Sequence, residues 1–182
     1  MKIEIVEPNE KISIEEINDL ENRFEFKFPA DYKKFLLESN GGEPTNGLAF
    51  LNDYSIGPLH VYDFFSLSYV QEHLEYIEED VKSYKEFIDS IKEHNENYQE
   101  VLESIQDEIK EYKSDLKHYI FAENHMIIIA DTFNNVLLWI CHKGENSGKI
   151  YWIDEIYNDQ FHLLADSFEQ FINGFSLDKG DF

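Results

Sequence analysis

Cysteine, basic residues and long apolar runs are all scarce in this chain, and each shortage excludes a class of protein. A single cysteine, Cys141, rules out an internal disulfide, and we expect it to be a small core residue rather than a nucleophile. No stretch approaches the roughly 20 apolar residues of a membrane span. Acids at Glu4 and Glu7 interrupt the first apolar residues, so a signal peptide is not expected. These features favour a cytoplasmic protein.

Positive charge is outnumbered throughout the chain. Lysine and arginine together number 15 against 38 acids, which gives a formal net charge of −23. A surface of this sign repels nucleic acid and anionic membranes, so neither is an expected partner. It attracts basic proteins and speeds their association at low salt. The plain alternative is that the acids only keep the protein soluble.

Motifs for catalysis and metal binding are also missing from the sequence. It holds no phosphate-binding loop, no dinucleotide fingerprint and no paired cysteine motif. No two of its seven histidines stand four residues apart, and His118, Glu123 and His125 come nearest to a ligand group. We therefore expect no enzyme activity, no metal and no cofactor. An acidic hydrolase ranks third among the possible functions, behind the two kinds of binding protein described below.

Two amphipathic helices are predicted before residue 42. The first carries an apolar stripe, and Ser13 with Glu16 forms a capping box at its start; the stripe consists of Ile14, Ile17, Leu20 and Phe24. The second begins at Pro29 and has Tyr32, Phe35 and Leu36 on one face. Asn40 and Gly41 can end it in the left-handed region. We expect the face of the second helix to pack on Leu20 and Phe24.

The second helix and the Asn-Gly-Gly after it resemble the SUKH superfamily, which includes fungal cell-wall-assembly regulators and many bacterial toxin immunity proteins. The matching positions are Phe28, Pro29, Asp31, Tyr32, Phe35, Leu36, Asn40, Gly41 and Gly42. The resemblance continues through a hairpin beginning at Ile127, the YW-x-D of residues 151–154 and a closing helix from Ser167 to Gly174. It departs at Asn134, where the family usually has glycine.

This resemblance implies a single SUKH-like domain over residues 1–182, with an α+β fold. We expect an antiparallel sheet of about five to six strands, N-terminal helices and a C-terminal helix. Residues 48–51 and 59–65 read as strands.

Residues 67–119 are predicted to contain an inserted helical hairpin. Apolar residues recur at alternating spacings of three and four from Leu67 to Ile91 and again from Tyr98 to Tyr119. The two halves stay in phase across Asn95, so one long helix, pairing with a partner helix, also fits. Four consecutive polar residues at 94–97 favour the hairpin. The choice between monomer and dimer stays open with it.

Acids alternate with aromatic residues near residue 155, and this mixture is a candidate docking surface for a basic partner. The predicted partner-binding residues are Glu43, Asp53, Trp152, Asp154, Glu155, Tyr157 and Asp159. The alternative interpretation is that the rings pack inward and the acids are only solvated.

These observations favour a non-catalytic binding protein. The resemblance implies an immunity protein that neutralises a basic, nuclease-like toxin domain by occupying it. A nuclease needs a basic cleft for phosphates, and a strongly acidic protein can fill that cleft as a charge mimic. The alternative is an intracellular scaffold or regulator resembling the cell-wall-assembly regulators. The sequence does not identify the toxin.

Overall fold

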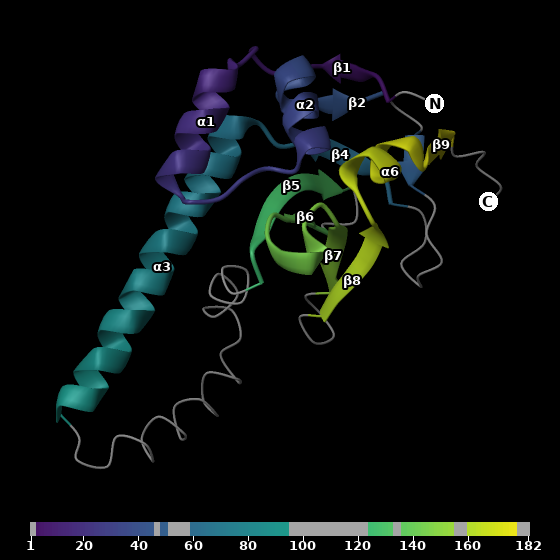
Figure 1. The fold of residues 1–182 in the computed structure, drawn as a ribbon. Helices are drawn as coiled ribbons and strands as arrows, with labels where there is room; N and C mark the ends of the chain where they lie inside the picture. Colours follow the sequence, from purple (N-terminus) through teal and green to yellow (C-terminus); the bar gives the residue numbers. More distant parts are fainter. Residues whose placement is uncertain are drawn as a thin grey trace. The chain divides into compact units, whose positions relative to one another are not determined.

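The computed structural model describes residues 3–45, 48–50, 59–94, 124–132, 136–154 and 160–177 (Figure 1). The chain divides into two compact units, one of residues 1–71 with 126–182 and the other of residues 72–125. All described strands lie in the first unit, together with α1 (Ile14–Arg23), α2 (Ala30–Ser39) and α6 (Phe168–Asn173).

The two predicted N-terminal helices are confirmed as α1 and α2. The Oγ of Ser13 accepts the Glu16 N–H at 3.2 Å, and the Glu16 carboxylate accepts the Ser13 N–H at 2.7 Å, which completes the capping box. At the C-terminal end of α2, the capping residue Asn40 adopts the left-handed conformation, with φ of 50°. Within the predicted apolar stripe, Ile17 and Leu20 are buried, whereas Ile14, at the first position of α1, is 38% exposed.

The Asn-Gly-Gly sequence fixes where the chain passes between two strands, β1 (Ile5–Glu7) and β4 (Val61–Phe64). A Cβ on Gly41 would lie 2.3 Å from the carbonyl oxygen of Phe64, and one on Gly42 would lie 2.2 Å from that of Glu7. Gly42 and Phe64 exchange two backbone hydrogen bonds of 2.8 and 3.1 Å. Only glycine permits this double approach, and its positive φ angles add to the requirement.

The side chain of Asn40 connects the end of α2 to the start of a long helix, α3 (Leu67–His94). Its amide Nδ2 donates to the carbonyl of Glu10 at 2.9 Å, and its Oδ1 accepts the Leu67 N–H at 2.8 Å. Because that N–H belongs to the first turn of α3, it has no partner within the helix. One side chain therefore joins the N-terminal segment, the end of α2 and the start of α3.

The predicted α+β fold is confirmed. A five-stranded antiparallel sheet has the order β4, β5 (Met126–Thr132), β6 (Leu138–Cys141), β7 (Ile150–Asp154) and β8 (Gln160–Ala165). Two small sheets pair β1 with β2 (Glu43–Pro44) and β3 (Leu48–Phe50) with β9 (Phe175–Leu177). Strand β9 was not expected from the sequence; it follows the predicted closing helix, α6.

A cluster of aromatic rings joins α2 and α6 to the large sheet, over which both helices lie (Figure 1). The ring of Phe168 lies 4.9 Å from that of Tyr32 and 5.0 Å from that of Phe35. Phe35 also meets Phe64 of β4 at 5.0 Å. Tyr32, Phe64 and Phe168 are buried, whereas Phe35 is only half-buried. Phe35 thus contacts rings from two distant parts of the chain.

Other predictions fall partly within the described residues. Cys141 is 3% exposed on β6 and its Sγ donates to the carbonyl of Lys143 at 3.2 Å, which confirms a core position. Residues 95–123 lie outside the described ranges, so the hairpin and the single long helix both stay predictions, as does the turn at Asn134. No helix in the ranges given above combines the length and apolar character needed to cross a membrane.

Candidate functional site

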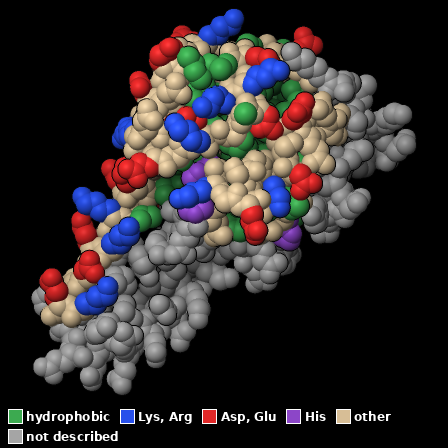
Figure 2. Space-filling model, viewed as in Figure 1, with side chains coloured by type: hydrophobic (Ala, Val, Ile, Leu, Met, Phe, Trp, Pro, Cys, Tyr) green, Lys and Arg blue, Asp and Glu red, His purple; other side chains and the backbone are tan. Residues whose placement is uncertain are grey.

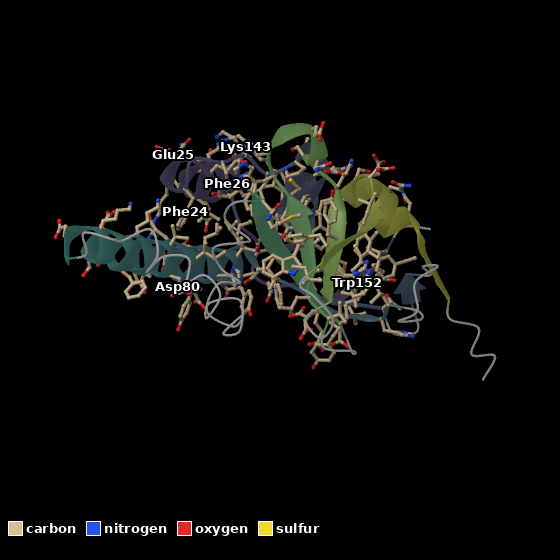
Figure 3. The ribbon with its side chains drawn as sticks, turned by 90° about the horizontal axis from the view of Figure 1, so that it is seen from below. Phe24, Glu25, Phe26, Asp80, Lys143 and Trp152 are labelled. Atoms are coloured by element: carbon tan, nitrogen blue, oxygen red, sulfur yellow. The ribbon has the colours of Figure 1, made fainter. Side chains whose placement is uncertain are left out.

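The structure describes only some of the predicted partner-binding residues. Asp53, Glu155, Tyr157 and Asp159 lie outside the described residues, and Asp154 ends β7 opposite Gln160. Trp152 is 4% exposed and its ring stacks on His162 at 4.2 Å, within the sheet region of Figure 3. For Trp152 the ring packs inward, as the alternative interpretation predicts.

Glu43, the remaining predicted contact, belongs to a group of like charges on neighbouring strands. Asp63 of β4 stands opposite Asp131 of β5 in the sheet register. Burial raises the pKa of the Asp63 carboxyl, and the negative charges of Glu43 and Asp131 raise it further. Among the described residues no group of acids, histidines and cysteines could hold a metal ion. This trio is therefore a point of repulsion between like charges.

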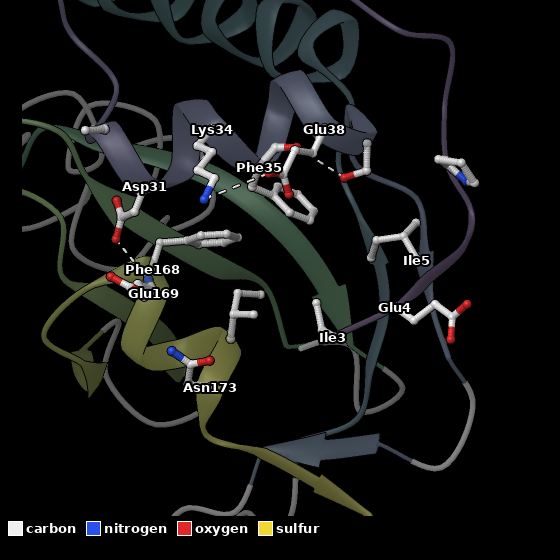
Figure 4. Close-up of a pocket in the computed structure, with 14 residues that line it drawn as sticks. Ile3, Glu4, Ile5, Asp31, Lys34, Phe35, Glu38, Phe168, Glu169 and Asn173 are labelled. Atoms are coloured by element: carbon white, nitrogen blue, oxygen red, sulfur yellow. Dashed lines mark hydrogen bonds and ion pairs between the residues drawn. The ribbon is translucent and has the colours of Figure 1, made fainter. Parts of the chain in front are cut away.

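A groove of about 850 Å³ opens between α2, α6 and the segment around β1, and we call it the α2–α6 groove (Figure 4). Its volume falls within the range of roughly 300–1,000 Å³ typical of ligand sites. Apolar side chains from all three walls form its floor: Ile3, Ile5, Phe35, Phe168 and Ile172. The ring contacts of Phe35 and Phe168 hold this floor in place before any partner arrives.

The rim of the α2–α6 groove is acidic. Four carboxylates line it: those of Glu4, just before β1, of Asp31 and Glu38 in α2, and of Glu169 in α6. Lys34 is the single cation among the residues that line it. On the face drawn in Figure 2, acidic and basic side chains are intermixed. Carboxylates above an apolar floor can bind ammonium or guanidinium groups while the floor covers their methylene chains.

Asp31 fixes the two helical walls of the groove to each other. Its Oδ2 accepts the Glu169 N–H at 2.9 Å, in the first turn of α6, and its Oδ1 accepts the Tyr32 N–H at 2.9 Å. Lys34 is held more loosely, because its Nζ lies 3.9 Å from the nearer oxygen of Glu38. The acid that shapes the groove is thus occupied by backbone donors, whereas the other carboxylates that line it belong to residues exposed at the rim.

A buried acid, Glu21, positions the start of α2. Its side chain is fully buried. Its Oε1 accepts the Phe28 N–H at 2.9 Å and lies 2.7 Å from the Nζ of Lys33, and its Oε2 lies 2.9 Å from the Nζ of Lys27. Burial alone would raise the pKa of Glu21, but the hydrogen bonds from Lys33, Lys27 and Phe28 outweigh it and lower the pKa. Glu21 therefore connects α1 to α2 and to the segment between them.

Sequence reasoning missed both the groove and Glu21. Phe35 and Ile172 were correctly placed on helices, but their half-burial depends on how far apart α2 and α6 lie. Asp31 and Glu169 read as surface acids. A signal for Glu21 was present, since it follows Leu20 on the apolar side of α1, with two lysines within 12 residues.

Comparison with known proteins supports the resemblance seen in the residues. A family model described as the SMI1 / KNR4 family (SUKH-1) matches residues 11–174, which is most of the chain. No curated protein matches it. Such a family fits an immunity protein or a regulator, and it suggests that binding other proteins is the relevant activity. The chain therefore belongs to the SMI1 / KNR4 family, SUKH-1.

Proposed function

We propose that this protein is a non-catalytic binding protein that neutralises a basic, nuclease-like toxin domain by occupying it. The observation that carries the proposal is the α2–α6 groove, in which four carboxylates and one lysine surround an apolar floor. Membership of the family and the net charge of −23 support it. The groove supplies a place where cations from another protein are favoured.

The proposed mechanism is electrostatic capture followed by steric exclusion. A nuclease holds phosphates with lysine and arginine, and the same side chains are attracted to a surface of opposite sign. The field of an acidic protein steers a basic partner toward it and raises the association rate at low salt. Once bound, the protein covers the cleft that nucleic acid would enter, so inhibition requires no chemical step.

The test measures association with a candidate toxin domain, such as a basic domain encoded beside this protein's gene. We expect the association rate to fall steeply as salt rises, because screening acts over about 8 Å at physiological ionic strength. Reversing Glu4 and Glu169 together to lysine should slow association. Reversing Glu25 and Glu145, which are exposed and do not line the groove, is the control of equal charge.

The residues predicted from the sequence supply a second arm. Reversing Asp154, Glu155 and Asp159 to lysine should also slow association if the docking surface extends to them, with little effect on folding. An association rate that ignores salt, or that changes equally in the groove and control variants, would count against the proposal. Tight binding without inhibition would favour the alternative, a scaffold or regulator.

A further inference from the structure

We propose that the segment of the partner that enters the α2–α6 groove is amphipathic as well as basic. In this inference, which rests on the proposed function, an apolar side chain packs on the floor of the groove. A neighbouring lysine or arginine of the partner takes the place of Lys34 beside Glu38. Charge then steers the encounter, and the apolar contact selects which basic partner stays bound.

The floor is suited to an apolar anchor. Ile3 and Phe168 are 8% and 2% exposed, so the base of the groove is closed and already packed. Phe35, Ile5 and Ile172 are half-buried and leave apolar surface facing the groove. Because Phe35 is fixed between Phe64 and Phe168, little side-chain entropy is lost when something packs on it. The interface residues that dominate binding energy tend to pack into well-formed pockets of the partner.

Lys34 marks the position of the partner's cation. Its side chain is 77% exposed and its Nζ lies 3.9 Å from Glu38, at the outer limit of an ion pair. Exposed pairs of this kind on a helix contribute little to stability. An incoming lysine or arginine can therefore displace Lys34 at small cost. Until it does, Lys34 reduces the negative charge of the rim and weakens binding of every cation.

A protein segment fits these features better than a small cation does. The carboxylates come from three separate elements and stand around an apolar floor, so a small polyamine would satisfy the charges and leave the floor uncovered. A segment with lysines on either side of an apolar residue satisfies both. The acidic rim disfavours any polyanion.

The experiment compares two fluorescein-labelled peptides by fluorescence anisotropy. One is a short peptide of interspersed lysine and leucine, and the other has each leucine replaced by serine, so their charges are equal. We expect the leucine peptide to bind about tenfold more tightly, which corresponds to about 1.4 kcal/mol. Ile172→Ser should remove most of that difference. Leu163→Ser, at a leucine that is 38% exposed on β8 and does not line the groove, should leave it unchanged.

Lys34 is tested by Lys34→Ala, which should tighten both peptides severalfold at low salt and less at high salt. Equal affinity of the two peptides for the unmodified protein overturns the apolar anchor, and this result needs no variant that could misfold. Spermine that competes as well as the leucine peptide would assign the groove to small polyamines. If the peptides bind equally while Glu4/Glu169 reversal still slows the native partner, only this inference fails; if that reversal also has no effect, the proposed function fails.

Discussion

Replacing Glu21 is the most informative perturbation of the fold, because one carboxylate serves three partners. In Glu21→Ala the Phe28 N–H loses its acceptor, which costs about 1–3 kcal/mol for a buried donor. Lys33, whose side chain is 23% exposed, loses its counter-charge, whereas Lys27, at 65%, turns to water. Together with the space left behind, we expect about 3–5 kcal/mol of destabilisation.

Glu21→Gln separates these contributions. Its amide oxygen can still accept the Phe28 N–H, so the buried donor stays satisfied. What is lost is the charge-assisted bond to Lys33, and we expect a cost of about 1.5–3 kcal/mol. Glu21→Gln should therefore be clearly more stable than Glu21→Ala.

Urea denaturation at neutral pH measures the loss of unfolding free energy in both variants. The comparison requires that the slope of unfolding free energy against urea concentration is the same in the variants and the wild type. The pH dependence gives a second check. Since the pKa of Glu21 is lowered from its ordinary value of 4.5, its stabilisation is complete above that value in the wild type. It is lost as the pH falls through the lower pKa of the folded state, and Glu21→Gln should lack this part of the acid loss.

Two results would refute this reasoning. If Glu21→Ala unfolds at the wild-type urea concentration, the contacts of Glu21 contribute nothing and α2 is positioned by packing alone. If Glu21→Gln is as unstable as Glu21→Ala, the Phe28 N–H is not the donor that matters, and the charge carries the whole effect.

Three further predictions concern single residues of the first unit. Tyr32→Phe should leave stability unchanged or raise it by up to about 1–2 kcal/mol in thermal melts, because its buried hydroxyl has no hydrogen-bond partner among the described residues; a clear loss would reveal a partner. Asp63→Asn should raise stability by up to about 1 kcal/mol near pH 7, since the repelled carboxylate is removed, and the gain should shrink as the pH falls through its raised pKa. Gly41→Ala and Gly42→Ala should each cost more than about 1 kcal/mol in urea denaturation, because both have positive φ and face backbone oxygens; wild-type stability of either would mean that the two chain segments separate easily.

Local patterns in the sequence determined the elements and their ends. The capping box at Ser13, the apolar face of α2 and the closing helix after Ser167 each depend on residues within a few positions of one another. In the five-stranded sheet, β4 followed from a short apolar run, and β5, β6 and β7 followed from the family resemblance, whereas β8 was not predicted. The family resemblance followed from the same local residues, which explains why the fold class could be predicted.

The proposed binding surface could not be predicted in this way. The predicted acidic and aromatic residues near 155 are neighbours in sequence, and Trp152 among them proved to be buried, with its ring stacked on His162 of the neighbouring strand. The α2–α6 groove instead combines residues near positions 4, 35 and 170, which meet only after the sheet has formed. The periodicity of apolar residues in a sequence does not indicate how far apart two such elements lie in the folded protein.

The sequence by itself therefore determined the sign of the charge, the described helices, most of the strands but not β8 or β9, and the glycine positions where two chain segments meet. Tertiary structure alone decided that Glu21 is a buried acid with three partners and that Phe35 is only half-buried in a groove lined by four carboxylates. The physical reason is one of range. Caps and periodicities act over a single turn, whereas burial and electrostatic fields are sums over every neighbour that folding brings near.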